Sequence, residues 1–201
     1  MGMDIESCKN RNGQNLMNSR TGTLLWISFF AAMTAVGGMI RIPTLIVPIT
    51  LQTLFVYLSG DLLGNKNGAY SQLLFLILGL IGIPVFAMGG GLGYVLQPTF
   101  GYLISFPLAA WVIGTTAKKF KSEKWLGWIA ANGTGFIVIN TTGVVYLYIN
   151  INFIVHQQLS WEQALWSGVL IFVPGEIVKI ILAAALARRL KPLMSCEGYQ
   201  T

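Results

Sequence analysis

The strongest candidates for chemistry in this sequence are two ionisable residues inside an apolar stretch near the C-terminus. Glu176 and Lys179 lie three positions apart, so on a helix they share one face. Pro174 precedes them and lacks an N–H, which leaves the carbonyl of Leu170 without its helical donor. Together they form a polar notch that can accept and donate hydrogen bonds. If this stretch crosses a bilayer, the notch indicates a ligand site, with a structural ion pair as the alternative.

A glycine-rich segment without any charge is the second candidate. Gly89, Gly90 and Gly91 let backbone N–H groups approach a ligand closely. Tyr94 and Tyr102 can pack on a ligand ring and hydrogen-bond through their hydroxyls. A flexible turn with interfacial tyrosines explains the same residues. The lack of charge favours the interpretation that this segment forms a lid that covers a pocket.

Polar side chains within apolar stretches form a third group. Gln52 and Asn140 are candidates for a pocket, because an amide offers both a donor and an acceptor. Asp61 is interpreted as a boundary residue, and Arg41 either attracts an anion or anchors the chain at the membrane interface. The other members are expected to hydrogen-bond between helices: Thr50, Thr53, Thr141 and Thr142.

Two alanines four positions apart indicate a close helix contact. Ala31 and Ala35 stack on one helical face, and such small residues let two helices approach closely. The contact can lie within the protein or with another protein. Spacing alone favours the internal contact.

The composition requires these residues to lie in a membrane protein. Of the 201 residues, 54% are hydrophobic and 10% are charged, whereas an ordinary soluble domain carries about 25% charged residues. So few charges cannot cover the surface of a soluble domain. The same composition also excludes a disordered chain, a nucleic-acid-binding domain and a secreted disulfide scaffold.

The gaps between charges predict six membrane spans. Asp, Glu, Lys and Arg are absent from residues 21–40, 42–60, 68–117 and 125–161. One helical crossing needs about 20 apolar residues, so the gap at 68–117 holds two. The apolar stretch around Glu176 and Lys179 supplies the last. The predicted spans are 23–40, 44–63, 68–87, 99–117, 126–149 and 163–187.

The basic residues predict the orientation of these spans. Eleven of the 13 Lys and Arg residues precede span one, follow span six, or lie between spans two and three or four and five. The positive-inside rule then places both termini in the cytoplasm. We expect one compact all-α bundle of six transmembrane helices at 21–191. A mobile cytoplasmic tail is expected at 1–20 and a second cytoplasmic tail at 192–201, so Cys8 and Cys196 in these tails should be reduced.

The absence of several sequence motifs reduces the number of function classes that fit this chain. The chain has no G-x-x-x-x-G-K-[ST] loop for ATP hydrolysis. One histidine, His156, and two tail cysteines cannot build a usual metal site. No Ser or Cys nucleophile lies near a candidate base. We therefore expect neither an enzyme nor a cofactor. A membrane enzyme with Glu176 as acid or base, and an ion-coupled carrier, are the alternatives.

The order of these features resembles the BioY family, the biotin-specific substrate-binding (S) components of energy-coupling factor transporters. The resemblance extends over nearly the whole chain from the first span. Two positions differ: the family usually reads Gly-Pro-Thr-Gly-Gly-Tyr where this chain has Gln97 and Phe100, and usually has Asp in place of Glu176. The residues that carry the resemblance are Val47-Pro48-Ile49-Thr50-Leu51-Gln52-Thr53, Gly82-Ile83-Pro84-Val85-Phe86, the glycine segment, Pro98-Thr99 with Gly101-Tyr102, and Pro174-Gly175 with Lys179.

The resemblance implies a multi-pass protein of a bacterial-type plasma membrane that captures biotin from outside for uptake. Its implied partners are biotin as the transported ligand, a transmembrane coupling protein (T component) and two ATPase subunits. It assigns docking of the coupling protein to the Ala31-x-x-x-Ala35 face, against the interpretation from spacing alone. An S component for another small vitamin is the nearest alternative. The expected binding residues are Gln52, Gly89, Gly90, Gly91, Tyr94, Thr99, Tyr102, Asn140, Glu176 and Lys179.

Overall fold

The computed structural model describes residues 20–42, 47–120 and 125–196. The predicted N-terminal tail before Arg20 and residues 197–201 of the C-terminal tail lie outside the described residues, as do the topology markers Lys121 and Lys124. The described chain is mostly helical. Its long helices are α2 (Arg20–Met39), α3 (Gln52–Ile81), α4 (Phe100–Lys119), α5 (Trp125–Ile149) and α7 (Val173–Cys196).

Short elements join the long helices. The two strands pair antiparallel, with Arg41 opposite Thr50. A capping box at Ser160 starts the short helix that leads toward α7. These elements are β1 (Arg41–Ile42), β2 (Ile49–Thr50), the 3-10 turn η1 (Leu92–Leu96), the π turn η2 (Asn150–Ile154), α6 (Trp161–Leu165) and the π turn η3 (Trp166–Leu170).

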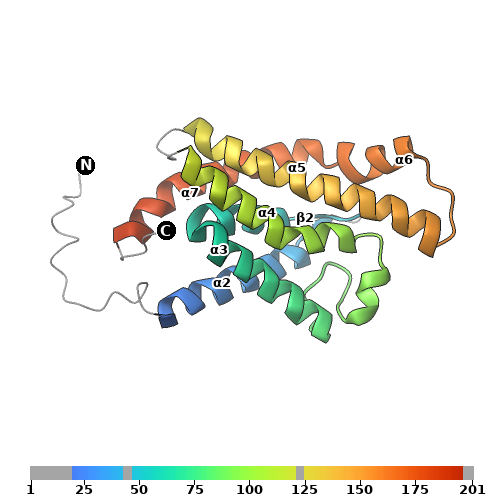
Figure 1. Ribbon diagram of the computed structural model, residues 1–201, viewed down its shortest axis with the longest axis horizontal. Helices are drawn as coiled ribbons and strands as arrows, with labels where there is room; N and C mark the ends of the chain where they lie inside the picture. Colours follow the sequence, from blue (N-terminus) through green and yellow to red (C-terminus); the bar gives the residue numbers. More distant parts are fainter. Residues whose placement is uncertain (1–19, 43–46, 121–124, 197–201) are drawn as a thin grey trace.

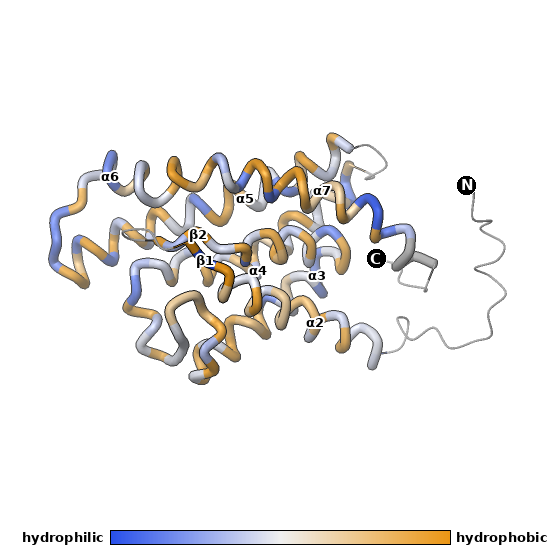
Figure 2. Tube along the Cα trace, turned by 180° about the vertical axis from the view of Figure 1, so that it is seen from behind, coloured by the Kyte–Doolittle hydropathy of each residue, from blue (hydrophilic) through white to orange (hydrophobic). Residues whose placement is uncertain are grey.

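The arrangement of the helices is that of a membrane protein. The long helices lie mostly along one direction, and the start of α2 lies at the same end as the C-terminal part of α7 (Figure 1). Hydrophobic residues dominate along the helices, whereas a strongly hydrophilic segment marks the C-terminal part of α7 (Figure 2). Four described segments are long and apolar enough to cross a bilayer: Arg20–Met39, Phe100–Lys119, Trp125–Ile154 and Trp161–Pro192.

The second and third predicted spans fall in one element with a break. α3 leaves helical geometry at Gly64, where φ is 78° and ψ is −173°, a backbone conformation that favours glycine. The two halves of α3 then pack side by side. A Cβ at Gly68 would lie only 2.8 Å from the carbonyl oxygen of Ser59.

The predicted outer limits of these two spans are wrong. The first half of α3 begins at Gln52 and not at 44, because part of the preceding stretch forms β2. The second half ends at Ile81 and not at 87. Gly82 adopts φ 116° there and closes the helix as a left-handed cap.

The last predicted span, 163–187, is divided. α6 and η3 occupy its first part, and α7 starts at Val173 and continues beyond 187. Pro174 therefore lies in the first turn of α7, where its missing N–H breaks no helical hydrogen bond, and does not open the middle of a helix. The predicted spans 23–40, 99–117 and 126–149 agree with α2, α4 and α5 to within a few residues.

Small residues let the helices approach closely near the break in α3. Gly114 of α4 lies against it, and a Cβ there would be 2.3 Å from the backbone nitrogen of Asn65. Large side chains fill the rest of the interior. Tyr57, Phe75 and Trp128 are almost completely buried. The core is therefore packed around the reversal of α3.

A buried polar network fastens α2 to both halves of α3. Thr34 Oγ1 donates to Gln72 Oε1 at 3.2 Å. Gln72 Nε2 donates to the hydroxyls of Ser59 at 3.1 Å and Ser71 at 3.2 Å. All four side chains are fully buried. Because each amide group is paired, the network can fix one arrangement of the helices.

The face of α2 that contains Thr34 also contains the two alanines predicted to dock a partner. Ala31 is 3% exposed and belongs to the core, and Ala35 packs against that core. Ala31 thus contributes to the packing of the core, whereas Ala35 is partly exposed. Ser28 and Ala32 are the small residues on the exposed face of α2 in this region.

The close approach at Gly114 predicts a sharp effect of one methyl group. We expect Gly114→Ala to lower the thermal unfolding midpoint, equivalent to roughly 1–3 kcal/mol, because the methyl would meet the α3 backbone. Gly133→Ala on α5 is the matched control, since nothing lies within 4 Å of its added Cβ. Thermal unfolding in one detergent compares the two. Equal midpoints would contradict the close approach.

Candidate ligand-binding site

A cavity of about 60 Å³ lies among the long helices. Its wall is partly apolar, with Phe106 and Phe172 among the lining residues. Side chains from α3, α4, α5 and α7 meet there although they are distant in sequence. Seven of the predicted binding residues line it: Gln52, Tyr94, Thr99, Tyr102, Asn140, Glu176 and Lys179.

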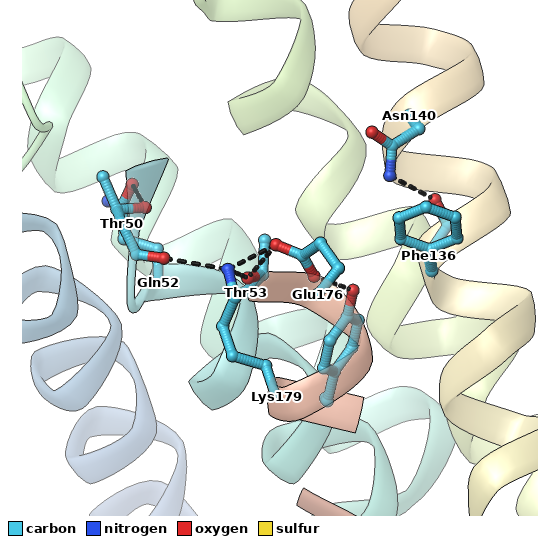
Figure 3. Close-up of polar contacts among 8 residues, drawn as sticks. Thr50, Gln52, Thr53, Phe136, Asn140, Glu176 and Lys179 are labelled. Atoms are coloured by element: carbon cyan, nitrogen blue, oxygen red, sulfur yellow. Dashed lines mark hydrogen bonds and ion pairs between the residues drawn. The ribbon is translucent and has the colours of Figure 1, made fainter. Parts of the chain in front are cut away.

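Glu176 and Lys179 form an ion pair in this site (Figure 3). Thr53 Oγ1 donates to Glu176 Oε1 at 2.9 Å, and Tyr57 OH donates to Glu176 Oε2 at 2.6 Å. Lys179 Nζ donates to Thr53 Oγ1 at 2.6 Å and to the carbonyl of Thr50 at 2.9 Å. Both charged residues are buried. These hydrogen bonds offset the loss of water around the two charges.

The first turns of two helices position this pair. Glu176 lies in the first turn of α7, where the positive end of the helix dipole favours a carboxylate. Gln52 and Thr53 begin α3. The hairpin of β1 and β2 ends just before α3 and presents the Thr50 carbonyl to Lys179. The site therefore depends on where these helices begin.

Two amides offer complementary groups to a ligand. Gln52 Oε1 accepts from Thr50 Oγ1 at 3.3 Å, while Gln52 Nε2 is buried without a hydrogen-bond partner among the described residues. Asn140 Nδ2 donates to the Phe136 carbonyl at 2.9 Å, which leaves its oxygen as the acceptor (Figure 3). The site thus presents an unused amide donor on α3 and an amide oxygen on α5.

The two predicted tyrosines have different tasks. Tyr94 in η1 accepts a hydrogen bond from Thr99 Oγ1 at 3.2 Å, and burial raises the pKa of its phenol, so it stays a donor at neutral pH. Tyr102 OH instead donates to the Gly168 carbonyl at 2.7 Å, next to α6 and α7. Tyr102 therefore offers its ring to the cavity and uses its hydroxyl to hold η3.

The glycine segment shapes the loop and does not line the cavity. The Gly89 N–H donates to the Phe86 carbonyl at 3.1 Å, and the Gly91 N–H donates to the Gly79 carbonyl at 2.7 Å. A Cβ at Gly90 would lie 2.3 Å from a backbone oxygen. Two of the three N–H groups expected to bind a ligand are thus already bonded, and the segment forms a tight turn on the end of α3.

Arg41 joins two segments that border the site. Its guanidinium donates to the carbonyl of Ala87, which lines the cavity. Arg41 itself is exposed. The side chain thus ties β1 to the loop after α3, a role that neither sequence interpretation of Arg41 included.

Sequence reasoning missed two residues that complete the ion pair. Thr53 makes the hydrogen bond between helices that is expected of it, from α3 to Glu176 on α7, but its place in the site is not predicted, and Tyr57 is not among the candidates. Both contact Glu176. Their spacing of four residues places them on one helical face, which is a usable signal once Glu176 is known to face α3. The apolar residues that line the cavity show no comparable pattern in the sequence.

Comparison with known proteins gives one family. The sequence matches the profile described as the BioY family over residues 10–195. The probable biotin transporter BioY of Lysinibacillus sphaericus is 45% identical over 175 residues, which cover 87% of this chain and 89% of that protein. The biotin transporter BioY of Thermotoga maritima is 39% identical over 171 residues, which cover 85% and 96%.

A solved structure shares the fold. The crystal structure of the S-component for biotin from an ECF-type ABC transporter superposes with a TM-score of 0.77 at 32% sequence identity. The match covers 87% of this chain and 93% of that chain.

The hydroxyl of Tyr57 offers a test of the geometry around Glu176. We expect Tyr57→Phe to lower the thermal unfolding midpoint, equivalent to about 1–3 kcal/mol, because a buried carboxylate oxygen loses its donor. Tyr70→Phe removes the same group from a residue that is 55% exposed and serves as the control. A midpoint for Tyr57→Phe that matches the control would contradict the contact.

Proposed function

The chain belongs to the BioY family, and from that premise we propose that it binds biotin at the outer side of the plasma membrane as the S component of an energy-coupling factor transporter. The family is one of transporter components and not of enzymes. The observation that carries the proposal is the buried Glu176–Lys179 pair in a partly apolar cavity. Such a pair supplies a carboxylate acceptor, held in place by the ammonium, in a site shielded from water.

The chemistry of biotin suits these groups. Its ring urea presents two N–H donors and one carbonyl acceptor. Glu176 Oε2 holds one hydrogen bond, from Tyr57, and can accept another from a ring N–H. The unused Gln52 Nε2 can donate to the ring carbonyl, whereas all three N–H groups of the Lys179 ammonium are already bonded, to Thr50, Thr53 and Glu176. Asn140 adds an amide oxygen for the second ring N–H.

The valerate carboxylate needs donors at the other end of the ligand. Tyr94 and Thr99 line the cavity on the loop side, and the Tyr94 hydroxyl, which accepts from Thr99 Oγ1, can donate to the carboxylate. We place the carboxylate there. The glycine segment contributes by holding η1 in position, since the N–H groups of Gly89 and Gly91 are already bonded. The rings of Tyr102, Phe106 and Phe172 cover the apolar part of the ligand.

We propose six crossings over 21–191, with both termini in the cytoplasm. The break at Gly64 supports the counting of α3 as two crossings. Orientation is supported by the basic residues at one end of the helices, where α2 starts, α4 ends and α7 finishes (Figure 1). These residues are Arg20, Lys118, Lys119, Arg188, Arg189 and Lys191.

The proposed partners are a transmembrane coupling protein and two ATPase subunits. The solved relative is the S-component of an ECF-type ABC transporter. The lack of a phosphate-binding loop supports an external energy source. We propose docking through the exposed face of α2 at Ser28 and Ala32, because Ala31 belongs to the core.

The ligand and its site can be tested together. Protein purified in detergent should carry biotin that mass spectrometry identifies. Glu176→Ala and Lys179→Ala should each reduce biotin affinity at least about 100-fold, because each leaves the other charge buried and unpaired. Thr141→Ala, at an exposed position of α5, should bind normally. Unchanged affinity in both site variants would overturn the assignment, and a different bound vitamin would overturn the choice of ligand.

The docking face has a separate test. Ala32→Trp should leave biotin affinity unchanged but abolish uptake and co-purification with the coupling protein, because a large ring blocks close helix contact. Ile137→Trp is the control, since Ile137 is 62% exposed on α5. Retained co-purification of Ala32→Trp would remove this face from the proposed interface.

A further inference from the structure

A second polar cluster lies outside the cavity, where α3, α5 and α7 meet. It consists of Asp61 on α3, Trp128 and Asn132 on α5, and Lys191 on α7. Asp61 and Asn132 are fully buried, and Trp128 is 2% exposed. None of the four lines the cavity. The cluster therefore needs an explanation that does not involve contact with the ligand.

Lys191 closes the end of a short helix. Its Nζ donates to the main-chain carbonyl of Asp61 at 3.1 Å and lies 4.9 Å from the centre of the Trp128 ring. The break at Gly64 ends the first half of α3, residues 52–63. Carbonyl groups at a helix C-terminus attract a cation, because they carry the negative end of the helix dipole. Lys191 thus caps this half of α3 from α7.

The side chain of Asp61 strengthens the same tie. Neither of its carboxylate oxygens has a hydrogen-bond partner among the described residues. Burial is the largest influence on this carboxyl, followed by the neighbouring Asn132 and then by the positive charge of Lys191. A buried carboxylate needs such compensation. The carbonyl of Asp61 accepts the hydrogen bond from Lys191, and the charge of its carboxylate can add to the attraction.

The seam of α7 between the two polar clusters consists of small residues. Ala183, Ala184 and Ala187 are each completely buried. Methyl groups allow close packing but have no polar atom that fixes how far α7 slides along its neighbours. Polar contacts at the two ends of this seam are then what sets the position of α7.

The first half of α3 contacts α7 at both polar clusters. Thr53, Tyr57 and Asp61 follow each other at intervals of four residues, so they lie along one face of α3. Thr53 and Tyr57 contact Glu176, and Asp61 contacts Lys191. A shift of α7 at one end is therefore transmitted to the other end.

We propose that Asp61 and Lys191 are positioning residues for the ligand site, which hold α3 and α7 in the register that assembles the Glu176–Lys179 pair. This inference rests on the proposed function, since the site it serves is the proposed biotin site. It adds a role for residues that do not touch the ligand.

The test is the rate at which biotin leaves purified, full-length Lys191→Met. We expect dissociation about tenfold faster than from the unchanged protein, because a hydrogen bond to a charged group is lost from the frame of the site. Lys191→Arg should return the rate to within about twofold, since a guanidinium can still donate to the carbonyl. Arg188→Met removes the same charge from an exposed position of α7 and should dissociate normally.

The thermal unfolding midpoint of each variant separates positioning from stability. A lower midpoint for Lys191→Met with an unchanged dissociation rate would reduce the cluster to a structural role and overturn the inference. If Lys191→Met does not fold, Asp61→Asn is measured in the same way. We expect about threefold faster dissociation, because the charge attraction is lost while the carbonyl contact stays. An unchanged rate there also overturns it. If the unchanged protein does not bind biotin, the proposed function itself fails, and this inference fails with it.

Discussion

A carboxylate and an ammonium inside a membrane protein are stable only where the chain provides hydrogen bonds for both. Here Glu176 and Lys179 receive them from Thr53, Tyr57 and the Thr50 carbonyl. These partners come from β2 and the first turns of α3, far from α7 in sequence. The pair therefore requires the hairpin, α3 and α7 to meet at one depth.

The packing of α3 follows from the requirement that α3 and α7 meet at the Glu176–Lys179 pair. A helix that presents residues 52–57 to α7 must end early enough to leave room for a second helix beside it, and Gly64 provides the break. Gly114 then allows α4 to approach that break, and Gln72 binds both halves of α3 to Thr34 of α2. Close contacts between small residues and a fully paired amide thus fix the helices beside the large buried side chains of the core.

The predictability of the site differs from residue to residue for physical reasons. Glu176 and Lys179 could be found from sequence, because a charge in a long apolar stretch is exceptional. Thr53 and Tyr57 could not, since their role depends on which helix faces α3 at that depth. The glycine segment was predicted to offer N–H groups to a ligand, but the destination of a backbone N–H is decided by tertiary contacts. The predicted helix limits are wrong where the hairpin and Gly82 interrupt stretches that look continuously apolar in the sequence.

The balance of charge in the site determines which end of a ligand can lie next to the Glu176–Lys179 pair. Glu176 and Lys179 neutralise each other, so the cluster as a whole carries no net charge. A neutral urea ring can donate to Glu176 Oε2 and keep this balance. A ring end with its own charge would leave one buried charge without a counter-ion. In the complex that we propose, the carboxylate of biotin therefore points away from the pair, toward the loop side with Tyr94 and Thr99. In that proposed complex, the same constraint that holds the helices together sets the direction in which the ligand binds.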